Sequence, residues 1–175
     1  MEAQSGRTNR RRFLLIAGLP LLAAGGLVTY AAWPEPNPDK VRVRTDLDLL
    51  KSRFGTYVGE LTEAHWLGYD MDESPGDRTI PSPDSRIRLA GVARLTAGGA
   101  AAITRNAEYA FTPTPPASAL PAPLAKYVPA DAAWQHSPQF DEYANRPQSN
   151  GRPSGAYHLD EARDLVHFDL VYLYT

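Results

Sequence analysis

The chain of 175 residues contains no cysteine. This absence excludes disulfide scaffolds, zinc sites with thiolate ligands, thiol nucleophiles and a lipid anchor attached through a thioether. The sequence also lacks Gly-x-Ser-x-Gly, Ser-x-x-Lys, His-Glu-x-x-His, Gly-x-Gly-x-x-Gly and P-loop motifs. A Ser-His-Asp triad assembled only by the fold stays open, because such triads have no fixed sequence order. The sequence therefore favours a binding or structural role over an enzyme, and it implies no cofactor.

Charge is absent from residues 13–33, a run of 21 mostly apolar residues behind the arginine-rich segment 1–12. As a helix this run would be about 31 Å long, which matches a hydrocarbon layer of about 30 Å. Arginines on its N-terminal side favour a cytoplasmic N-terminus and an exported body. We therefore expect residues 13–33 to be a transmembrane anchor that contacts membrane lipid, with residues 1–12 in the cytoplasm.

The start of the apolar run resembles the twin-arginine export motif. Arg10, Arg11, Phe13 and Leu14 match that pattern, whereas Asn9 does not, so ordinary Sec export stays open. The resemblance implies that export machinery which carries folded cargo handles the chain. A cleaved signal peptide is the alternative, with cleavage near Ala31 releasing a secreted binder or inhibitor, although 21 residues exceed the roughly 7–15 of a signal core.

Residues 34–40 contain three prolines and predict a stiff spacer. We expect residues 41–175 to form one extracytoplasmic domain. Its class should be α+β, with a small antiparallel sheet of about four strands and two or three short helices. The acidic balance, a net charge of −2 for the whole chain, argues against nucleic acid as a partner.

The elements of this domain follow from local patterns. Thr45 begins a helical pattern that ends at Gly55, and Tyr57–Leu61 and Ala64–Tyr69 have strand composition. Arg86–Leu95 alternates as a strand, and its Arg86, Arg88 and Arg94 share one face. That stripe could bind lipid headgroups, but pairing with nearby acids is the simpler interpretation. Further helices are expected after Thr96 and after Ser137-Pro138.

The C-terminus predicts a β-hairpin, with Ala156–Leu159 and Leu165–Leu173 flanking a polar turn at Glu161–Asp164. If Asp160 pairs with Leu165, then Leu159 faces Val166 and Tyr157 faces Phe168 on the core side. The opposite face then carries four polar side chains: His158, His167, Asp160 and Asp169. Imidazoles and carboxylates together could bind a divalent metal and support an exported metal-dependent hydrolase. The alternative is the polar solvent face of a half-buried sheet.

Aromatic residues offer a second candidate site. A pocket for a small ligand or glycan could be lined by Trp66, Tyr69, Trp134 and Tyr157. Ordinary core packing is the alternative, since tryptophan buries a large area and needs one hydrogen bond.

Several short segments of the body resemble exported or membrane-anchored actinomycete proteins of uncharacterised function. The matching pieces are His65-Trp66-Leu-Gly68, Pro75-Gly-Asp-Arg78 with Ile80-Pro81, Trp134 with Ser137-Pro-Gln-Phe140, and Tyr157-His-Leu-Asp160 with Val166-His-Phe-Asp169. The resemblance implies an envelope location and a single domain, and it assigns no catalytic residue.

Overall fold

An antiparallel sheet organises the part of the chain that the computed structural model describes, which comprises residues 42–72, 85–147 and 152–173. These residues belong to a single unit, residues 35–175. The expected segments 1–12, 13–33 and 34–40 lie outside the described residues, as do Arg10, Arg11, Phe13 and Leu14. Within the described ranges, no helix is both long enough and apolar enough to span a bilayer.

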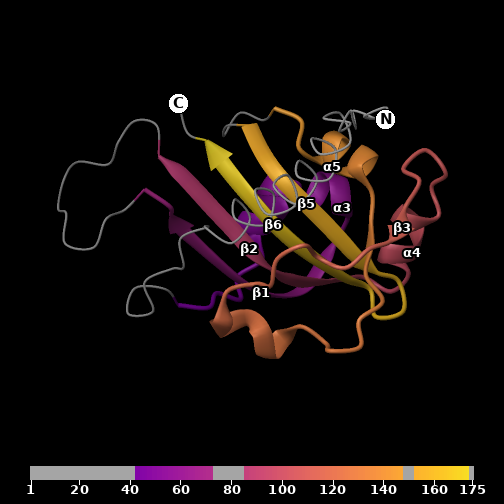
Figure 1. Cartoon of the computed structure of the whole chain (residues 1–175), viewed down its shortest axis with the longest axis horizontal. Coiled ribbons are helices and arrows are strands. Elements are labelled where there is room, and N and C mark those ends of the chain that lie inside the picture. The colour runs from indigo at the N-terminus through magenta and orange to yellow at the C-terminus, as the bar shows by residue number, and fades with distance from the viewer. Residues whose placement is uncertain (1–41, 73–84, 148–151, 174–175) are drawn as a thin grey trace, which may run out of the picture. The chain divides into compact units, whose positions relative to one another are not determined.

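Six strands form this sheet among the described residues (Figure 1). They are β1 (Leu61–Asp70), β2 (Arg86–Leu95), β3 (Thr112–Pro113), β4 (Gln135–His136), β5 (Arg152–Asp160) and β6 (Leu165–Leu173), in the order β1-β2-β6-β5-β4-β3. The α+β class is confirmed, but the expected number of about four strands is wrong. β3 and β4 have two residues each, which is too short for an alternating pattern to be visible in the sequence. β4 pairs with the edge of β5, and β3 pairs with β4, so both join the sheet only when the chain folds as a whole.

The N-terminal helical run differs from its prediction at both ends. It consists of α2 (Asp48–Leu50), η1 (Lys51–Gly55, a π-helical segment) and α3 (Thr56–Val58). The run passes through Gly55 and ends at Gly59, whose φ of 87° suits glycine. The predicted strand Tyr57–Leu61 is therefore wrong. Phe54 and Val58 are buried at helical spacing, which stabilises the helical conformation of this stretch.

Three further helical segments complete the described chain: α4 (Gly99–Thr104), the 3₁₀ turn η2 (Ala122–Tyr127) and α5 (Pro138–Ala144). The predicted helix start at Ser137-Pro138 is confirmed. The Ser137 hydroxyl accepts a hydrogen bond from the backbone N–H of Phe140 at 3.0 Å, and Pro138 occupies the first turn.

The predicted hairpin forms with the predicted register. His158 pairs with His167, Tyr157 with Phe168 and Leu159 with Val166, while residues 161–164 make the turn. β5 starts at Arg152, four residues before the predicted start at Ala156. β6 lies between β2 and β5, which explains why its apolar residues occur on both faces.

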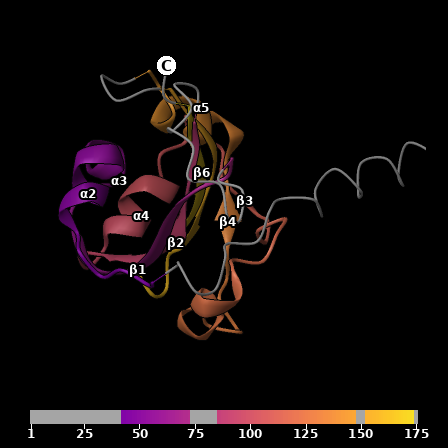
Figure 2. The ribbon, with the colours of Figure 1, turned by 90° about the vertical axis from the view of Figure 1, so that its left-hand side faces the viewer.

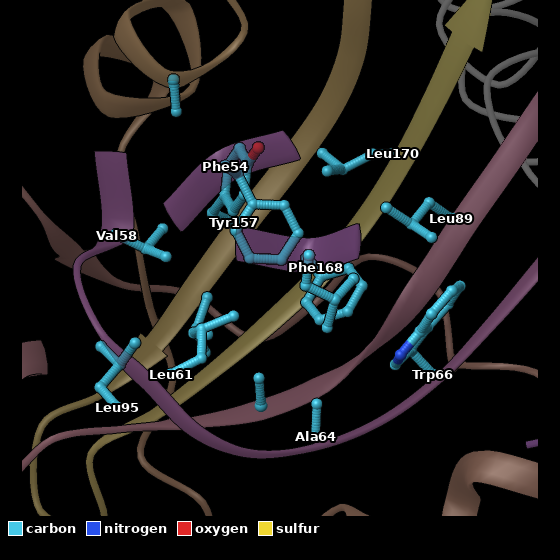
Figure 3. Close-up of a cluster of buried hydrophobic side chains, with 14 of the residues drawn as sticks. Phe54, Val58, Leu61, Ala64, Trp66, Leu89, Leu95, Tyr157, Phe168 and Leu170 are labelled. Carbon is cyan, nitrogen blue, oxygen red and sulfur yellow. The ribbon is translucent and has the colours of Figure 1, made fainter. Parts of the chain in front are cut away.

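The main core lies on the sheet face that carries the helices α2, α3 and α4 (Figure 2). Phe54 contacts the rings of Phe168 and Tyr157, with centroid distances of 4.9 and 5.8 Å (Figure 3). Tyr157 and Phe168 are fully buried, as the hairpin register predicted.

The opposite face is also covered, which the sequence did not predict. Leu120 and Leu124 pack there on Leu67 and Ala90, and Trp134 packs on Val92 and Leu165. The proline-rich segment around η2, drawn in orange in Figure 2, supplies much of this second layer. The polar side chains of this face are therefore largely shielded from solvent.

Candidate functional site

All four histidines of the chain lie in a single row across the sheet. His65 on β1 is opposite Val92, which is opposite His167 on β6. His167 is opposite His158 on β5, and His158 is opposite His136 on β4. Directly opposed residues share one face of a sheet, so the four imidazoles share the second face. The sequence predicted only the central pair, because the positions of β1 and β4 relative to the hairpin are set by long-range pairing.

The two central histidines are buried and neutral. His158 and His167 are only 6% and 3% exposed. Burial, and to a lesser extent repulsion from the charged forms of His167 and His136, lowers the pKa of His158 to about 3. Burial also lowers the pKa of His167, to about 4. The His158 ring stacks on His136 at 4.8 Å and meets His167 edge-on at 5.5 Å. Among the described residues, neither buried Nδ1 atom has a hydrogen-bond partner.

The predicted metal cluster is not assembled, because both carboxylates are bonded elsewhere. Asp169 accepts two hydrogen bonds of 2.8 Å from the guanidinium of Arg88, and the two side chains are 13% and 6% exposed. Asp160 is fully buried and accepts a 2.9 Å bond from Arg163. Within residues 42–72, 85–147 and 152–173, no group of three or more histidine, aspartate or glutamate side chains is arranged to hold a metal ion.

The predicted aromatic pocket does not form either. Trp66 and Tyr157 lie in the helix-covered core, and the Trp66 indole N–H donates to the carbonyl of Asp46 at 2.9 Å. Tyr69 and Trp134 pack on the opposite face of the sheet, in two separate clusters. The strand alternation places Trp66 and Tyr69, three positions apart on β1, on opposite faces. The four rings therefore cannot line a single pocket.

The three arginines of the β2 stripe pair with nearby acidic side chains, the alternative to lipid binding that the sequence analysis gave as simpler. Arg86 bonds to Asp72 at 3.1 Å, and the Nε of Arg94 lies 3.6 Å from Glu63. Arg88 is buried in its pair with Asp169, as described above, and its Nη1 also donates to the Tyr69 hydroxyl at 2.8 Å. These arginines therefore stabilise the sheet and its connections.

A surface hollow beside α5 is the site that the sequence analysis missed. We call it the α5 hollow; its volume is about 570 Å³. Its walls include Glu108, Tyr109, Gln139, Glu142, Tyr143, Asn145 and Arg146. Gln139, Glu142 and Tyr143 lie three or four positions apart, so α5 presents them on one side, and Asn145 and Arg146 follow directly after the helix. Glu108 and Tyr109 reach the hollow from the turn that follows α4.

The aromatic walls of the α5 hollow are fixed by packing from the core. Tyr143 meets Tyr57 edge-on at 5.3 Å, and Tyr109 meets the buried Phe140 at 5.2 Å. The two tyrosine rings lie 5.6 Å apart, and the Arg146 guanidinium lies 4.8 Å from the centre of the Tyr143 ring. The hollow therefore combines aromatic walls with polar groups at its surface.

Hydrogen bonds hold α5 and the turn after α4 together. The Ser137 hydroxyl donates to the carbonyl of Tyr109, which joins the two walls of the hollow. Asp141 accepts from the backbone N–H of Tyr157 at 2.9 Å and bonds His136 at 2.7 Å, so α5 is held on the sheet. The Tyr109 phenol is protonated at neutral pH, and its pKa is raised further above the ordinary value, mainly by burial. The helix cap at Ser137 could be predicted from the sequence, but its contact with Tyr109 could not.

A second, smaller cavity lies on the histidine face. It measures about 130 Å³ and is bordered by His65 and Tyr127, whose rings stack at 3.7 Å. Small-molecule sites usually measure roughly 300–1,000 Å³. The His65 cavity falls below that range. The α5 hollow falls within it, as does a third hollow of about 400 Å³ beside Arg105 and Glu161, whose lining contains no aromatic side chain.

No family model, curated protein or solved structure matches this chain. The choice of the α5 hollow as the candidate site therefore rests on its geometry and chemistry.

Proposed function

We propose that this chain is a membrane-anchored extracytoplasmic domain that binds a ligand of the cell envelope through the α5 hollow. Residues 13–33 would be the anchor, residues 34–40 the spacer and residues 41–175 the binding domain. The observation that carries the binding role is an open hollow of about 570 Å³ with both aromatic and polar walls. Its volume suits a small molecule or a short stretch of polymer.

Pre-organisation supports binding at this place. The two tyrosines are held by ring contacts with the core, and α5 is held by Ser137 and Asp141. A wall that is ordered before the ligand arrives reduces the entropy lost on association. The exposed Gln139, Glu142 and Arg146 then supply polar contacts.

The location is tested with the full-length chain carrying a C-terminal tag. We expect the tag to sediment with membranes and to be digested when protease is added to intact spheroplasts. Replacing Arg10 and Arg11 by lysine tests the twin-arginine route, which predicts loss of export. A tag that stays protected from protease would refute the outward orientation. A mature N-terminus at Ala32 would show that the segment is cleaved and the domain secreted, so that residues 13–33 are not an anchor.

The binding role is tested by sedimentation of the detergent-solubilised full-length chain with insoluble bacterial cell-wall material. The double variant Glu142→Ala/Arg146→Ala removes two exposed side chains of the α5 hollow and leaves the net charge unchanged. The matched control is Lys51→Ala/Glu60→Ala, which removes one exposed charge of each sign away from the hollow. We expect the hollow variant alone to lose binding. No sedimentation of the unaltered chain would refute the proposed binding function.

A further inference from the structure

We infer that the ligand of the α5 hollow is an uncharged, hydroxyl-rich carbohydrate, as found in the glycan strands of a bacterial envelope. This inference rests on the proposed binding function and names its ligand class. It follows from three properties of the lining: the balance of charge, the type of hydrogen-bonding groups and the presence of aromatic rings.

The charges around the hollow disfavour a strongly charged ligand. Glu108 and Glu142 are exposed carboxylates on its rim, so an anionic polymer would meet like charges there. Arg146 is exposed on the same rim and lies against the Tyr143 ring, so it offsets one of the two carboxylates and leaves a polycation little net attraction. A ligand without net charge suits this near balance of charge.

The hydrogen-bonding groups match neighbouring hydroxyls. Carboxylates offer two acceptor oxygens, and a guanidinium offers a planar set of donors. The Gln139 amide adds a donor and an acceptor, and the Tyr109 phenol, whose pKa burial raises, can both donate and accept. Sugar hydroxyls also donate and accept, so they can satisfy each of these groups.

The tyrosines suit the apolar faces of sugar rings. Tyr109 and Tyr143 both line the hollow, and contacts with Phe140 and Tyr57 fix their orientations. An acyl chain or an apolar peptide would need a broad apolar wall instead. Among the described residues, the only large hydrophobic side chain that is strongly exposed is Leu173, at 44%, and it does not line the hollow.

The test compares cell-wall material that has been stripped of one component at a time. A muramidase cleaves the glycan strands into disaccharide units, an amidase removes wall peptides, and hydrofluoric acid removes phosphodiester-linked polymers; each treated material is then used as a competitor against untreated wall. The full-length chain is kept in a detergent without a sugar headgroup, so that the detergent cannot compete. We expect muramidase treatment to lower the apparent affinity of the competitor at least tenfold, and we expect the other two treatments to change it less than twofold.

The two double variants are tested against the same cell-wall material. Glu142→Ala/Arg146→Ala should lower affinity for untreated wall at least tenfold, whereas Lys51→Ala/Glu60→Ala should stay within twofold of the unaltered chain. A competitor that still binds after muramidase treatment and no longer binds after amidase or hydrofluoric acid treatment would overturn the carbohydrate inference. The binding function would still stand in that case, provided that the hollow variant is defective. If both variants retain binding, the ligand does not bind in the α5 hollow, and the inference is overturned as well.

Discussion

The buried histidine pair predicts that the domain loses stability in mild acid. The pKa values of His158 and His167 are lowered from 6.5 to about 3 and about 4 in the folded chain, mainly by burial. The unfolded chain takes up protons near pH 6.5, whereas the folded chain does not, so acid favours unfolding. Above about pH 7 both states hold neutral histidines, and the free energy of unfolding loses nothing to histidine protonation. It falls progressively as the pH decreases from 6.5 towards 3.

The magnitude at pH 5 follows from the distance to the unfolded pKa. At this pH both imidazoles are still neutral in the folded chain, so their mutual repulsion does not enter. pH 5 is about 1.5 units below the histidine pKa in the unfolded chain. Protonation therefore stabilises the unfolded chain by about 2 kcal/mol for each histidine. We therefore expect the free energy of unfolding to fall by about 4 kcal/mol between pH 7 and pH 5. Most exposed carboxylates titrate below this range.

Urea denaturation followed by tryptophan fluorescence at pH 7, 6 and 5 measures this loss. His158→Phe should reduce the loss to about 2 kcal/mol, and a second change, His167→Phe, should remove most of the remainder. Val166→Ala is the control, because it removes buried atoms of the same hairpin without a titratable group. It should lower stability at every pH by a similar amount. A loss below about 1 kcal/mol in the unaltered chain, or an unchanged loss in the double histidine variant, would refute the reasoning.

Three further predictions concern the sheet, and urea denaturation at pH 7 measures each. Phe168→Ala removes a fully buried ring and should cost about 3–5 kcal/mol; a cost below about 1 kcal/mol would contradict the observed packing. Arg88→Met leaves the carboxylate of Asp169 buried without its partner and should cost about 3–5 kcal/mol, whereas Arg88→Met/Asp169→Leu should recover most of that loss. Equal instability of the single and double variants would show that the arginine matters through packing instead. Gly91→Ala would place a Cβ 2.5 Å from the His65 carbonyl oxygen and should cost about 1–3 kcal/mol; a neutral outcome would mean that β1 and β2 separate easily.

The hairpin shows how far sequence reasoning reaches in this chain. A four-residue polar turn and a period of two were sufficient to predict that His158 faces His167 and that Tyr157 faces Phe168. The helix start at Ser137 was also predictable, because a serine cap followed by proline acts within one turn. In these cases the interacting residues are close in sequence, so local rules are enough.

The two candidate sites proposed from the sequence failed for a different reason. The metal cluster required Asp160 and Asp169 to be available, but Arg163 and Arg88 bind them. Arg88 is on β2, and no local pattern reveals that β2 lies beside β6. The aromatic pocket required rings from both faces of the sheet to converge, which strand alternation forbids once the boundaries of β1 are known.

Sequence alone determined the α+β class, the hairpin with its register and the apolar, charge-free run at residues 13–33, because each depends on neighbours along the chain. Tertiary structure decided that the second face of the sheet is covered, that all four histidines share one row and that Tyr109 and α5 enclose a hollow. These features join segments that are far apart in sequence. Their formation depends on which surfaces are buried against each other, and the period of a single strand or helix carries no information about that.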